Sequence, residues 1–455
     1  GDHRDLHLSI RRQRQMCIRD RDIKALKSSN LKGKVNIPGD KSISHRSIIL
    51  SSIAEGISEI SGFLTGEDCL ATLNAFKKMG IKIDQHDRHI RVHGLGLNGL
   101  TKPSEDLDLG NSGTSMRLLA GLLSGQNFSS NLKGDNSLSS RPMNRIIKPL
   151  NKMGALISLE GDTAPIFIQP SKKLEGISYE LPVASAQVKS CIMLAGLYAQ
   201  TETTIIENHQ TRNHTEKMFE KFGIEIKEKY ENKHKFIKVS PPKKLNPSKI
   251  DIPGDFSSAS FLIVAGLIIP NSEIIIKNVG INSSRTALLK VLSEMGADIQ
   301  INNVKDDFEK TADISVRTSE LKALVLDEDL VPNLIDELPI LFIAASFANG
   351  KTIIRGAEEL RAKESDRLEA MSYSLGNLGI EFKNYRDGID IFGKGSFKSS
   401  VTIDSFGDHR IAMAFTIAGV RASGPISIED CENVATSFPG FVSLARSVGI
   451  DVRET

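Results

Sequence analysis

An amphipathic run that ends in glycine recurs six times along the chain, and after each one apolar and polar residues alternate. This regular recurrence indicates an internal repeat. A glycine just past a helix adopts the left-handed conformation without strain, and the alternation is typical of a half-buried strand. The predicted helix ends are Gly80, Gly154, Gly223, Gly296, Gly379 and Gly449.

Between these junctions lie apolar helices of mostly small residues, such as SMRLLAGLLSGQNF and SFLIVAGLIIPNSEIII, each leading into another strand. Helices that are apolar nearly all round are buried inside a domain. Each unit therefore contains a strand, a buried helix, a strand, a surface helix and a hairpin. Three units before Pro253 and three after it predict an α/β fold of two similar domains, each of three βαβαββ units.

The domain boundaries follow from counting strands. The sixth unit ends at Val452 without its closing strand, and residues 22–36 precede the first unit and are available to supply it. We therefore predict a first domain at 38–253 and a second domain at 22–37 plus 254–455. The chain would cross between them at two similar turns, IPGD at 37–40 and again at 252–255. Residues 1–21 carry six arginines without periodicity, and we expect a non-native or disordered extension there.

Composition narrows the class of protein. A chain of 455 residues suits two large domains, and 40% hydrophobic with 25% charged residues is typical of a globular protein. The formal net charge of +2 gives no reason to expect a nucleic-acid partner, and no apolar run reaches the roughly 20 residues that span a membrane. Four scattered cysteines fit a reduced, cytoplasmic protein without disulfides or a zinc site.

Charged and hydroxyl residues collect where the buried helices begin. The first such entrance, DKSISHR, holds Lys41, Ser42, His45 and Arg46, and others read LGNSGTSMR, ASAQVKS, LIDELP and GDHR. Helix N-termini favour anions, and added Lys or Arg makes a site for phosphate or carboxylate. Taken one at a time, the Ser, Asn and Asp residues are better explained as N-caps. The charged run RAKESDR alone would be a solvated face. The recurrence at equivalent places favours an anion site.

Together these motifs resemble those of the 5-enolpyruvylshikimate-3-phosphate synthase family. DKSISHR, GNSGTSMR, SRPM, ASAQVKS, TRNHTEK, RAKESDR and GDHRIAM occur in the family's order and span the chain from residue 22 onward. The resemblance implies an inverse α/β barrel in each domain, with the ligand cleft between the domains. It also implies transfer of the enolpyruvyl group of phosphoenolpyruvate to the 5-hydroxyl of shikimate 3-phosphate, without metal or organic cofactor.

The resemblance also assigns site residues. Asp336 would take the hydroxyl proton, while Glu364 and Lys41 would move protons at the phosphoenolpyruvate carbon. Shikimate 3-phosphate would be held by Lys41, Ser42, Arg46, Ser185, Gln187, Arg212, Asp336 and Lys363. Phosphoenolpyruvate would be held by Lys41, Gly113, Arg141, Gln187, Arg367 and Arg410.

Some positions depart from one branch of the family. Thr436 stands where that branch has lysine, Leu118 where it has proline, and Ala186 where it has serine. These features resemble the divergent class II branch, which includes glyphosate-tolerant enzymes. Gly113 is retained, however, where an alanine would crowd glyphosate. We therefore keep glyphosate as a candidate inhibitor and expect a monomer.

Two rival functions stay open. One is enolpyruvyl transfer to UDP-N-acetylglucosamine, whose family usually carries a reactive loop cysteine. Cys69 and Cys191 do not lie in sequences typical of exposed loops, and DKSISHR also speaks against this rival. The other is a catalytically silent protein that binds phosphorylated ligands. The retained acid and base residues weigh against it.

Overall fold

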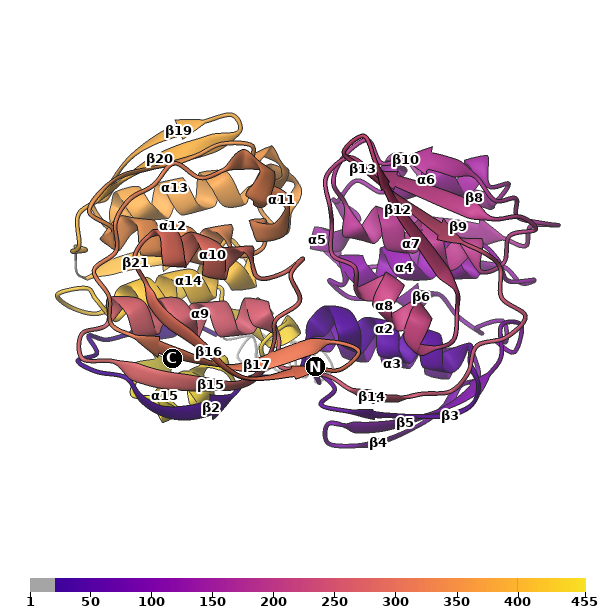
Figure 1. Ribbon diagram of the computed structural model, residues 1–455, viewed down its shortest axis with the longest axis horizontal. Coiled ribbons are helices and arrows are strands. Elements are labelled where there is room, and N and C mark those ends of the chain that lie inside the picture. Colours follow the sequence, from indigo (N-terminus) through magenta and orange to yellow (C-terminus); the bar gives the residue numbers. More distant parts are fainter. Residues whose placement is uncertain (1–20, 399) are drawn as a thin grey trace, which may run out of the picture.

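The computed structural model describes residues 21–398 and 400–455, which form two lobes side by side (Figure 1). The extension predicted at 1–21 lies outside the described residues except for Arg21. Two separate hydrophobic cores are present. One gathers buried side chains from residues 43–252, and the other gathers them from 23–37 and 256–452. We infer from these cores that each lobe is a domain, here called the first and second domain.

The buried helices predicted from the apolar runs form the centre of each domain. In α9, all residues from Phe256 to Ile268 are buried, because no face of this helix is polar enough to meet water. The first domain contains α2 (Lys41–Ser52), α4 (Gly113–Leu123) and α7 (Ala186–Gly196). The second contains α9 (Phe256–Ile268), α12 (Leu338–Phe347) and α14 (His409–Gly419).

Surface helices end at the six predicted glycines. All six glycines have positive φ angles, between 81° and 100°, which confirms the predicted left-handed caps. The helices are α3 (Glu67–Lys78), α6 (Asn144–Lys152), α8 (His214–Lys221), α10 (Ala287–Glu294), α13 (Arg367–Asn377) and α15 (Phe441–Ser447). Shorter helical turns are α5 (Asn136–Ser139), α11 (Val331–Leu334), η1 (Glu328–Leu330), η2 (Glu358–Ala362) and η3 (Glu432–Thr436).

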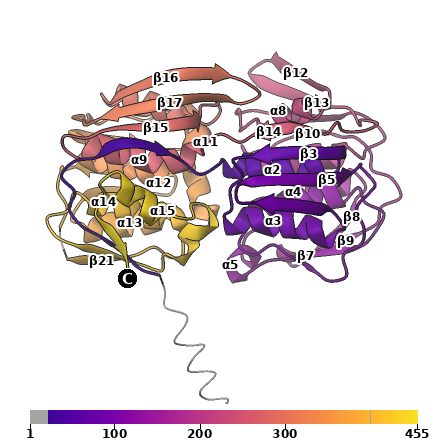
Figure 2. The ribbon, with the colours of Figure 1, turned by 90° about the horizontal axis from the view of Figure 1, so that it is seen from below.

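The described strands form six small sheets, each closed by an antiparallel hairpin. Figure 2 shows that they lie outside the buried helices, for example β5 in front of α2. The first domain has β14 (Lys249–Asp251), β3 (Glu55–Ser61), β5 (His89–Leu95), β4 (Lys82–His86); β6 (Leu107–Asp108), β7 (Ser130–Lys133), β9 (Thr163–Gln169), β8 (Leu156–Glu160); and β10 (Ser178–Glu180), β11 (Thr203–Glu207), β13 (His234–Val239), β12 (Ile226–Glu231). The second has β16 (Asp298–Asp306), β17 (Lys310–Arg317), β15 (Glu273–Gly280), β2 (Lys32–Asn36); β18 (Gly350–Ile354), β20 (Gly388–Gly393), β19 (Glu381–Tyr385); and β21 (Val401–Asp404), β22 (Ile426–Glu429), β1 (Ile23–Ala25), β23 (Val452–Glu454).

The fifth unit departs from the predicted βαβαββ order. Its first strand is reduced to isolated bridges, Lys322 to Asn349 and Val325 to Ile353. Val325 is 71% exposed, so little apolar burial is available here to extend the pairing.

The two IPGD turns lie side by side where the chain crosses between the domains. Gly39 and Gly254 form an antiparallel bridge, and the Asp40 N–H donates to the Pro253 carbonyl at 2.8 Å. A Cβ on Gly39 would lie 1.9 Å from the Gly62 carbonyl oxygen, so only glycine fits there. Beside this crossing, β2 pairs with β15 of the second domain and β14 pairs with β3 of the first.

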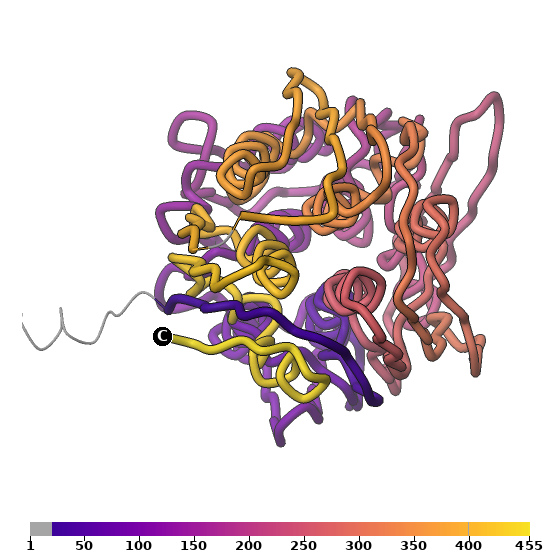
Figure 3. The backbone as a smooth tube through the Cα atoms, turned by 90° about the vertical axis from the view of Figure 1, so that its left-hand side faces the viewer, coloured from indigo at the N-terminus to yellow at the C-terminus, as the bar shows by residue number. Residues whose placement is uncertain are grey.

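The N-terminal strand lies in the second domain. β1 is antiparallel to both β22 and β23, with Ile23 opposite Ile428 and Glu454. Figure 3 shows this indigo segment beside the yellow C-terminal residues. The sixth hairpin is therefore completed by residues from the start of the described chain.

Candidate active site

A cleft of about 820 Å³ lies between the domains, and side chains from both of them line it. The starts of four buried helices, α2, α4, α7 and α14, meet there, together with the turn that precedes α12. Most of the predicted site residues line this cleft: Lys41, Ser42, Gly113, Arg141, Ser185, Gln187, Arg212, Asp336, Lys363, Glu364 and Arg410. Arg46 and Arg367 do not line it and lie behind its walls.

Several residues at the helix starts act as N-caps. Asp40 accepts a hydrogen bond from the Ile43 N–H at 2.8 Å and begins α2, while Asp408 accepts from the Arg410 N–H at 2.9 Å and begins α14. Ser185 accepts from the Val188 N–H at the start of α7 and also lines the cleft. The capping interpretation therefore holds for these residues. For Ser185, capping does not exclude contact with a ligand.

Asp336 lies among cations from both domains. It forms an ion pair with Arg212 of the first domain, and its carboxylate lies 3.5 Å from Arg367 Nη1. Arg410 Nη1 donates to the Asp336 carbonyl at 2.6 Å. Burial opposes ionisation of this carboxyl, but the surrounding cations, led by Arg212, outweigh burial and hold the pKa of Asp336 well below its usual range.

Glu364 has a similar environment. Arg367 Nη2 donates to it at 2.6 Å, and Arg141 Nη1 of the first domain lies 3.6 Å away. Burial again opposes the charge, but Arg367 and Arg141 outweigh it and hold the pKa of Glu364 well below its usual range. Arg367 itself is 1% exposed and also donates to Asp408 at 2.7 Å. Through Arg367, the two carboxylates Asp336 and Glu364 share one buried cation.

Lys41 projects from the first turn of α2 and pairs with Asp68 on α3. Burial lowers the pKa of Lys41, but Asp68 more than compensates, so that the pKa is raised. The Lys41 N–H donates to Asp255 of the second domain at 3.0 Å. On the opposite wall, burial lowers the pKa of Lys363, and burial together with Lys41 lowers the pKa of His409 to about 3. His409 is therefore neutral at pH 7.

A second cationic pair lines the first-domain wall. Arg117 Nη1 donates to Gln187 Oε1 at 2.6 Å, and Gln187 Nε2 donates to Thr114 Oγ1 at 3.0 Å. Arg141 Nη2 donates to the Asn111 side chain at 2.5 Å. These bonds fix two guanidinium groups beside the start of α4, where unpaired N–H groups already favour an anion.

Arg46 is held behind the first-domain wall. Its Nε donates to Thr215 Oγ1 and its Nη2 to Ser190 Oγ, each at 2.7 Å, and its Nη1 donates to the Ser42 carbonyl at 2.9 Å. Burial lowers the pKa of Arg46 to about 10, so the side chain stays cationic at pH 7.

The sequence motifs missed several residues that line the cleft: Asp68, Arg145, Arg285 and Glu359. Arg145 and Glu359 form an ion pair from opposite domains, which no local sequence pattern indicates. Near the departures from the family pattern, Thr436 is buried and donates to the Asn433 carbonyl at 2.7 Å, whereas Ser437 lines the cleft.

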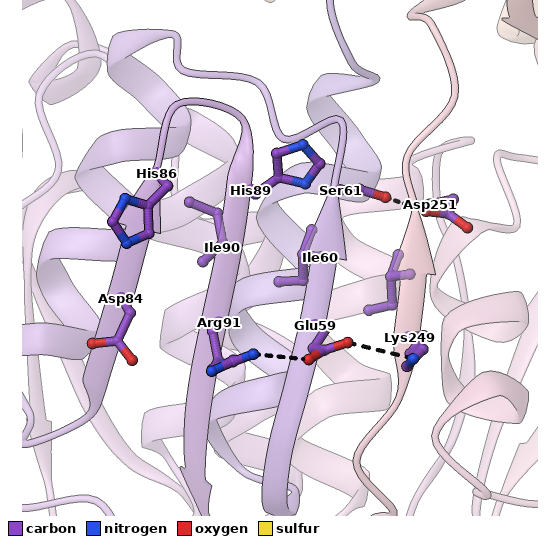
Figure 4. Close-up of a pocket in the computed structure, with 11 residues that line it drawn as sticks. Glu59, Ile60, Ser61, Asp84, His86, His89, Ile90, Arg91, Lys249 and Asp251 are labelled. Atoms are coloured by element: carbon purple, nitrogen blue, oxygen red, sulfur yellow. Dashed lines mark hydrogen bonds and ion pairs between the residues drawn. The ribbon is translucent and has the colours of Figure 1, made fainter.

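A second cavity, of about 490 Å³, lies on the outer sheet of the first domain (Figure 4). Its charges are paired with one another. Arg91 lies 3.1 Å from Glu59, Lys249 lies 3.5 Å from Glu59, and Ser61 donates to Asp251. We therefore place the functional site in the cleft between the domains.

Three further features concern cofactors, thiols and membranes. Within residues 21–398 and 400–455, no group of three or more His, Cys, Asp or Glu side chains is placed to hold a metal ion. Cys69, Cys191 and Cys431 are buried free thiols. No single helix of the described chain has the length and apolar composition to cross a membrane, and one pair of helices passes only across a bend of 120°.

Known proteins resemble this chain over most of its length. The family profile described as EPSP synthase (3-phosphoshikimate 1-carboxyvinyltransferase) matches residues 26–444. The 3-phosphoshikimate 1-carboxyvinyltransferase of Methylococcus capsulatus is 50% identical over 425 residues, which cover 93% of this chain and 96% of that protein. That of Legionella pneumophila strain Corby is 50% identical over 426 residues, covering 93% and 97%.

Solved structures agree. An EPSP synthase structure from Acinetobacter baumannii superposes with a TM-score of 0.85 at 46% identity, covering 96% of this chain and 100% of that one. The enolpyruvyl transferase NikO from Streptomyces tendae gives a TM-score of 0.76 at 16% identity, covering 96% and 99%, and shares the fold.

Proposed function

Because this chain belongs to the EPSP synthase family, the 3-phosphoshikimate 1-carboxyvinyltransferases, we propose that it transfers the enolpyruvyl group of phosphoenolpyruvate to shikimate 3-phosphate. The 5-hydroxyl oxygen forms a bond to C2 of phosphoenolpyruvate, and inorganic phosphate leaves. The observation that carries the proposal is the cleft that joins two carboxylates and several cations from both domains.

Shikimate 3-phosphate lies against the first domain in this proposal. Its contacts are Lys41, Ser42, Arg46, Ser185, Gln187, Arg212, Asp336 and Lys363. The cationic members suit a phosphate, and the hydroxyl and amide members suit the ring hydroxyls. The ion pair between Arg212 and Asp336 must open as this substrate enters, because both partners then face it.

Phosphoenolpyruvate lies between the domains, with contacts from Lys41, Gly113, Arg141, Gln187, Arg367 and Arg410. Guanidinium groups bind carboxylate and phosphate in a bidentate manner, which suits a ligand that carries both. Arg141 comes from the first domain and Arg367 with Arg410 from the second, so the ligand needs both domains at once.

Proton transfer completes the reaction. Asp336 accepts the proton of the 5-hydroxyl as its oxygen attacks C2, while Lys41 and Glu364 supply a proton to C3 and a tetrahedral ketal forms. Loss of a proton from C3 and departure of phosphate then restore the double bond. Anions that bind to Arg212, Arg141 and Arg367 weaken the cations' hold on Asp336 and Glu364. Their pKa values then rise toward the range useful for proton transfer.

The experiment that tests the proposal measures phosphate release from phosphoenolpyruvate, with shikimate 3-phosphate and UDP-N-acetylglucosamine in separate reactions. Release only with shikimate 3-phosphate supports it. Asp336→Asn and Glu364→Gln should each lose at least about 10²-fold in turnover while substrate binding persists. Release only with UDP-N-acetylglucosamine, or ligand binding without any release, would replace the proposal with one of the two rivals.

Three finer proposals rest on the same family. We propose that the protein acts as a monomer in the cytoplasm, and that glyphosate competes with phosphoenolpyruvate. Gly113 supports glyphosate sensitivity, because its missing side chain leaves room beside Arg117 and Arg141.

A further inference from the structure

Lys189 is a buried charge that the proposed mechanism does not use. Its motif, ASAQVKS, suggested a place at the cleft with Ser185 and Gln187. In the structure the side chain is fully buried on α7 and does not line the cleft. A buried ammonium is stable only when charged or polar partners compensate it closely.

Two glutamates from different elements compensate this charge. Lys189 Nζ lies 2.6 Å from Glu216 Oε1 on α8 and 3.1 Å from Glu207 Oε1 at the end of β11. The second carboxylate oxygens of both glutamates are buried without a hydrogen-bond partner in the described part of the chain. The ammonium of Lys189 is thus the point where α7, α8 and β11 are joined.

The connection through Glu207 leads to Arg212. Glu207 Oε1 also accepts hydrogen bonds from the backbone N–H of Thr211, at 3.3 Å, and from its hydroxyl. Thr211 directly precedes Arg212, which lines the cleft and faces Asp336. The position of Glu207 therefore sets where the loop presents Arg212.

The connection through Glu216 leads to Arg46. Thr215, the neighbour of Glu216 on α8, accepts from Arg46 Nε, and Ser190, the neighbour of Lys189 on α7, accepts from Arg46 Nη2. The two hydroxyls are themselves 2.6 Å apart. The ion pair and the contacts of Arg46 therefore cross the same α7–α8 interface.

We propose that Lys189 is a positioning residue for the shikimate 3-phosphate site, which holds Arg46 and Arg212 in register through Glu216 and Glu207. The proposal rests on the proposed function, in which these two arginines bind that substrate. Lys189 does not touch the substrate in this proposal.

The chain offers a matched control in Lys235, the second buried lysine of the same cluster. Lys235 lies 2.7 Å from Glu228 and 4.0 Å from Glu216, and it is 3% exposed. It has no contact with Glu207, Thr211 or Arg46 among the interactions of the described residues. Loss of Lys235 therefore removes a comparable buried charge without breaking either connection.

The test compares Lys189→Met and Lys235→Met by titration calorimetry with shikimate 3-phosphate and by steady-state kinetics with phosphoenolpyruvate. The Kd for shikimate 3-phosphate should rise about tenfold or more in Lys189→Met, the factor equivalent to one charge-assisted hydrogen bond. It should change less than about twofold in Lys235→Met, and the KM for phosphoenolpyruvate should change little in either. Equal increases in Kd in both variants would mean a merely structural role and would overturn the proposal.

A second variant protects the test against misfolding. Lys189→Met combined with Glu207→Gln and Glu216→Gln removes all three charges together and leaves no unpaired buried ion. This variant should show the same rise in Kd, and a wild-type Kd in the folded protein would overturn the proposal. Arg46→Lys and Arg212→Lys are measured in parallel. If neither changes the Kd, the proposed substrate contacts fail; if both raise it and the Lys189 variants do not, only the positioning role fails.

Discussion

Replacing Gly113 by alanine tests the phosphoenolpyruvate site most directly. Gly113 begins α4, so alanine adopts its backbone conformation without strain. The added Cβ would lie 2.8 Å from Arg117 Nη1 and 3.2 Å from Arg141 Nη1. Ordinary contact begins at about 3.5 Å, so the two guanidinium groups must retreat by about 0.7 Å and about 0.3 Å.

The magnitude follows from what these arginines hold. Arg117 donates to Gln187 at 2.6 Å, and Arg141 donates to Asn111 at 2.5 Å, so neither group moves without stretching a bond. A hydrogen bond to a charged group contributes about 1.5–3 kcal/mol. Partial loss of one such contact to phosphoenolpyruvate, about 1.4 kcal/mol, raises its KM about tenfold.

The assay is phosphate release against phosphoenolpyruvate concentration at saturating shikimate 3-phosphate, repeated with glyphosate. Gly113→Ala should raise the KM for phosphoenolpyruvate, leave the Kd for shikimate 3-phosphate nearly unchanged, and weaken inhibition by glyphosate. Adding Arg117→Lys, with Arg117→Lys alone as control, removes the closest clash and should recover part of the loss. An unchanged KM in folded Gly113→Ala would refute the placement of phosphoenolpyruvate beside α4.

Two further predictions concern stability and thiol chemistry. Burial disfavours the charged form of Asp313, but hydrogen bonds led by that from Lys277 outweigh it and lower its pKa to about 2. Its stabilising contribution is complete above the unfolded pKa of about 3.9 and disappears as the pH falls toward about 2. Asp313→Asn should therefore lower the urea midpoint at pH 7 and approach wild type near pH 2; a constant difference across this range would contradict the assignment. Separately, burial raises the pKa of each thiol in the described chain, so iodoacetamide at pH 7.5 should leave turnover intact unless these cysteines are first exposed by urea. Inactivation that maps to one of them in the folded protein would favour the UDP-N-acetylglucosamine reaction; the residues are Cys69, Cys191 and Cys431.

The repeat was predictable because its signals are local. A glycine such as Gly80 follows its helix directly, and the apolar composition of α9 is readable within 13 residues. The reduced first strand of the fifth unit was not predictable in this way. Its residues alternate much as the other first strands do, and the exposure of Val325 depends on tertiary packing.

Within the cleft, motifs located the right helix starts but not the direction of each side chain. Gln187 and Lys189 are two residues apart on α7, and a helix turns about 200° over that interval, so one faces the cleft and the other the core. Arg46 is one turn deeper in α2 than Ser42, about 6 Å from the cleft end. The pair Arg145 and Glu359 forms between residues 214 positions apart, so neither segment alone carries the signal.

The placement of β1 has a consequence for the order in which the protein folds during synthesis. The Asp430 N–H donates to Asp22 Oδ1, and these partners are 408 residues apart in the chain. Residues 38–253 are contiguous, so their domain has all its strands except β2-type partners from elsewhere once β14 has left the ribosome. β1 and β2, although made first, stay unpaired until β15, β22 and β23 emerge. The nascent chain thus carries two open strand edges through most of translation, and these edges are where we expect chaperones to bind.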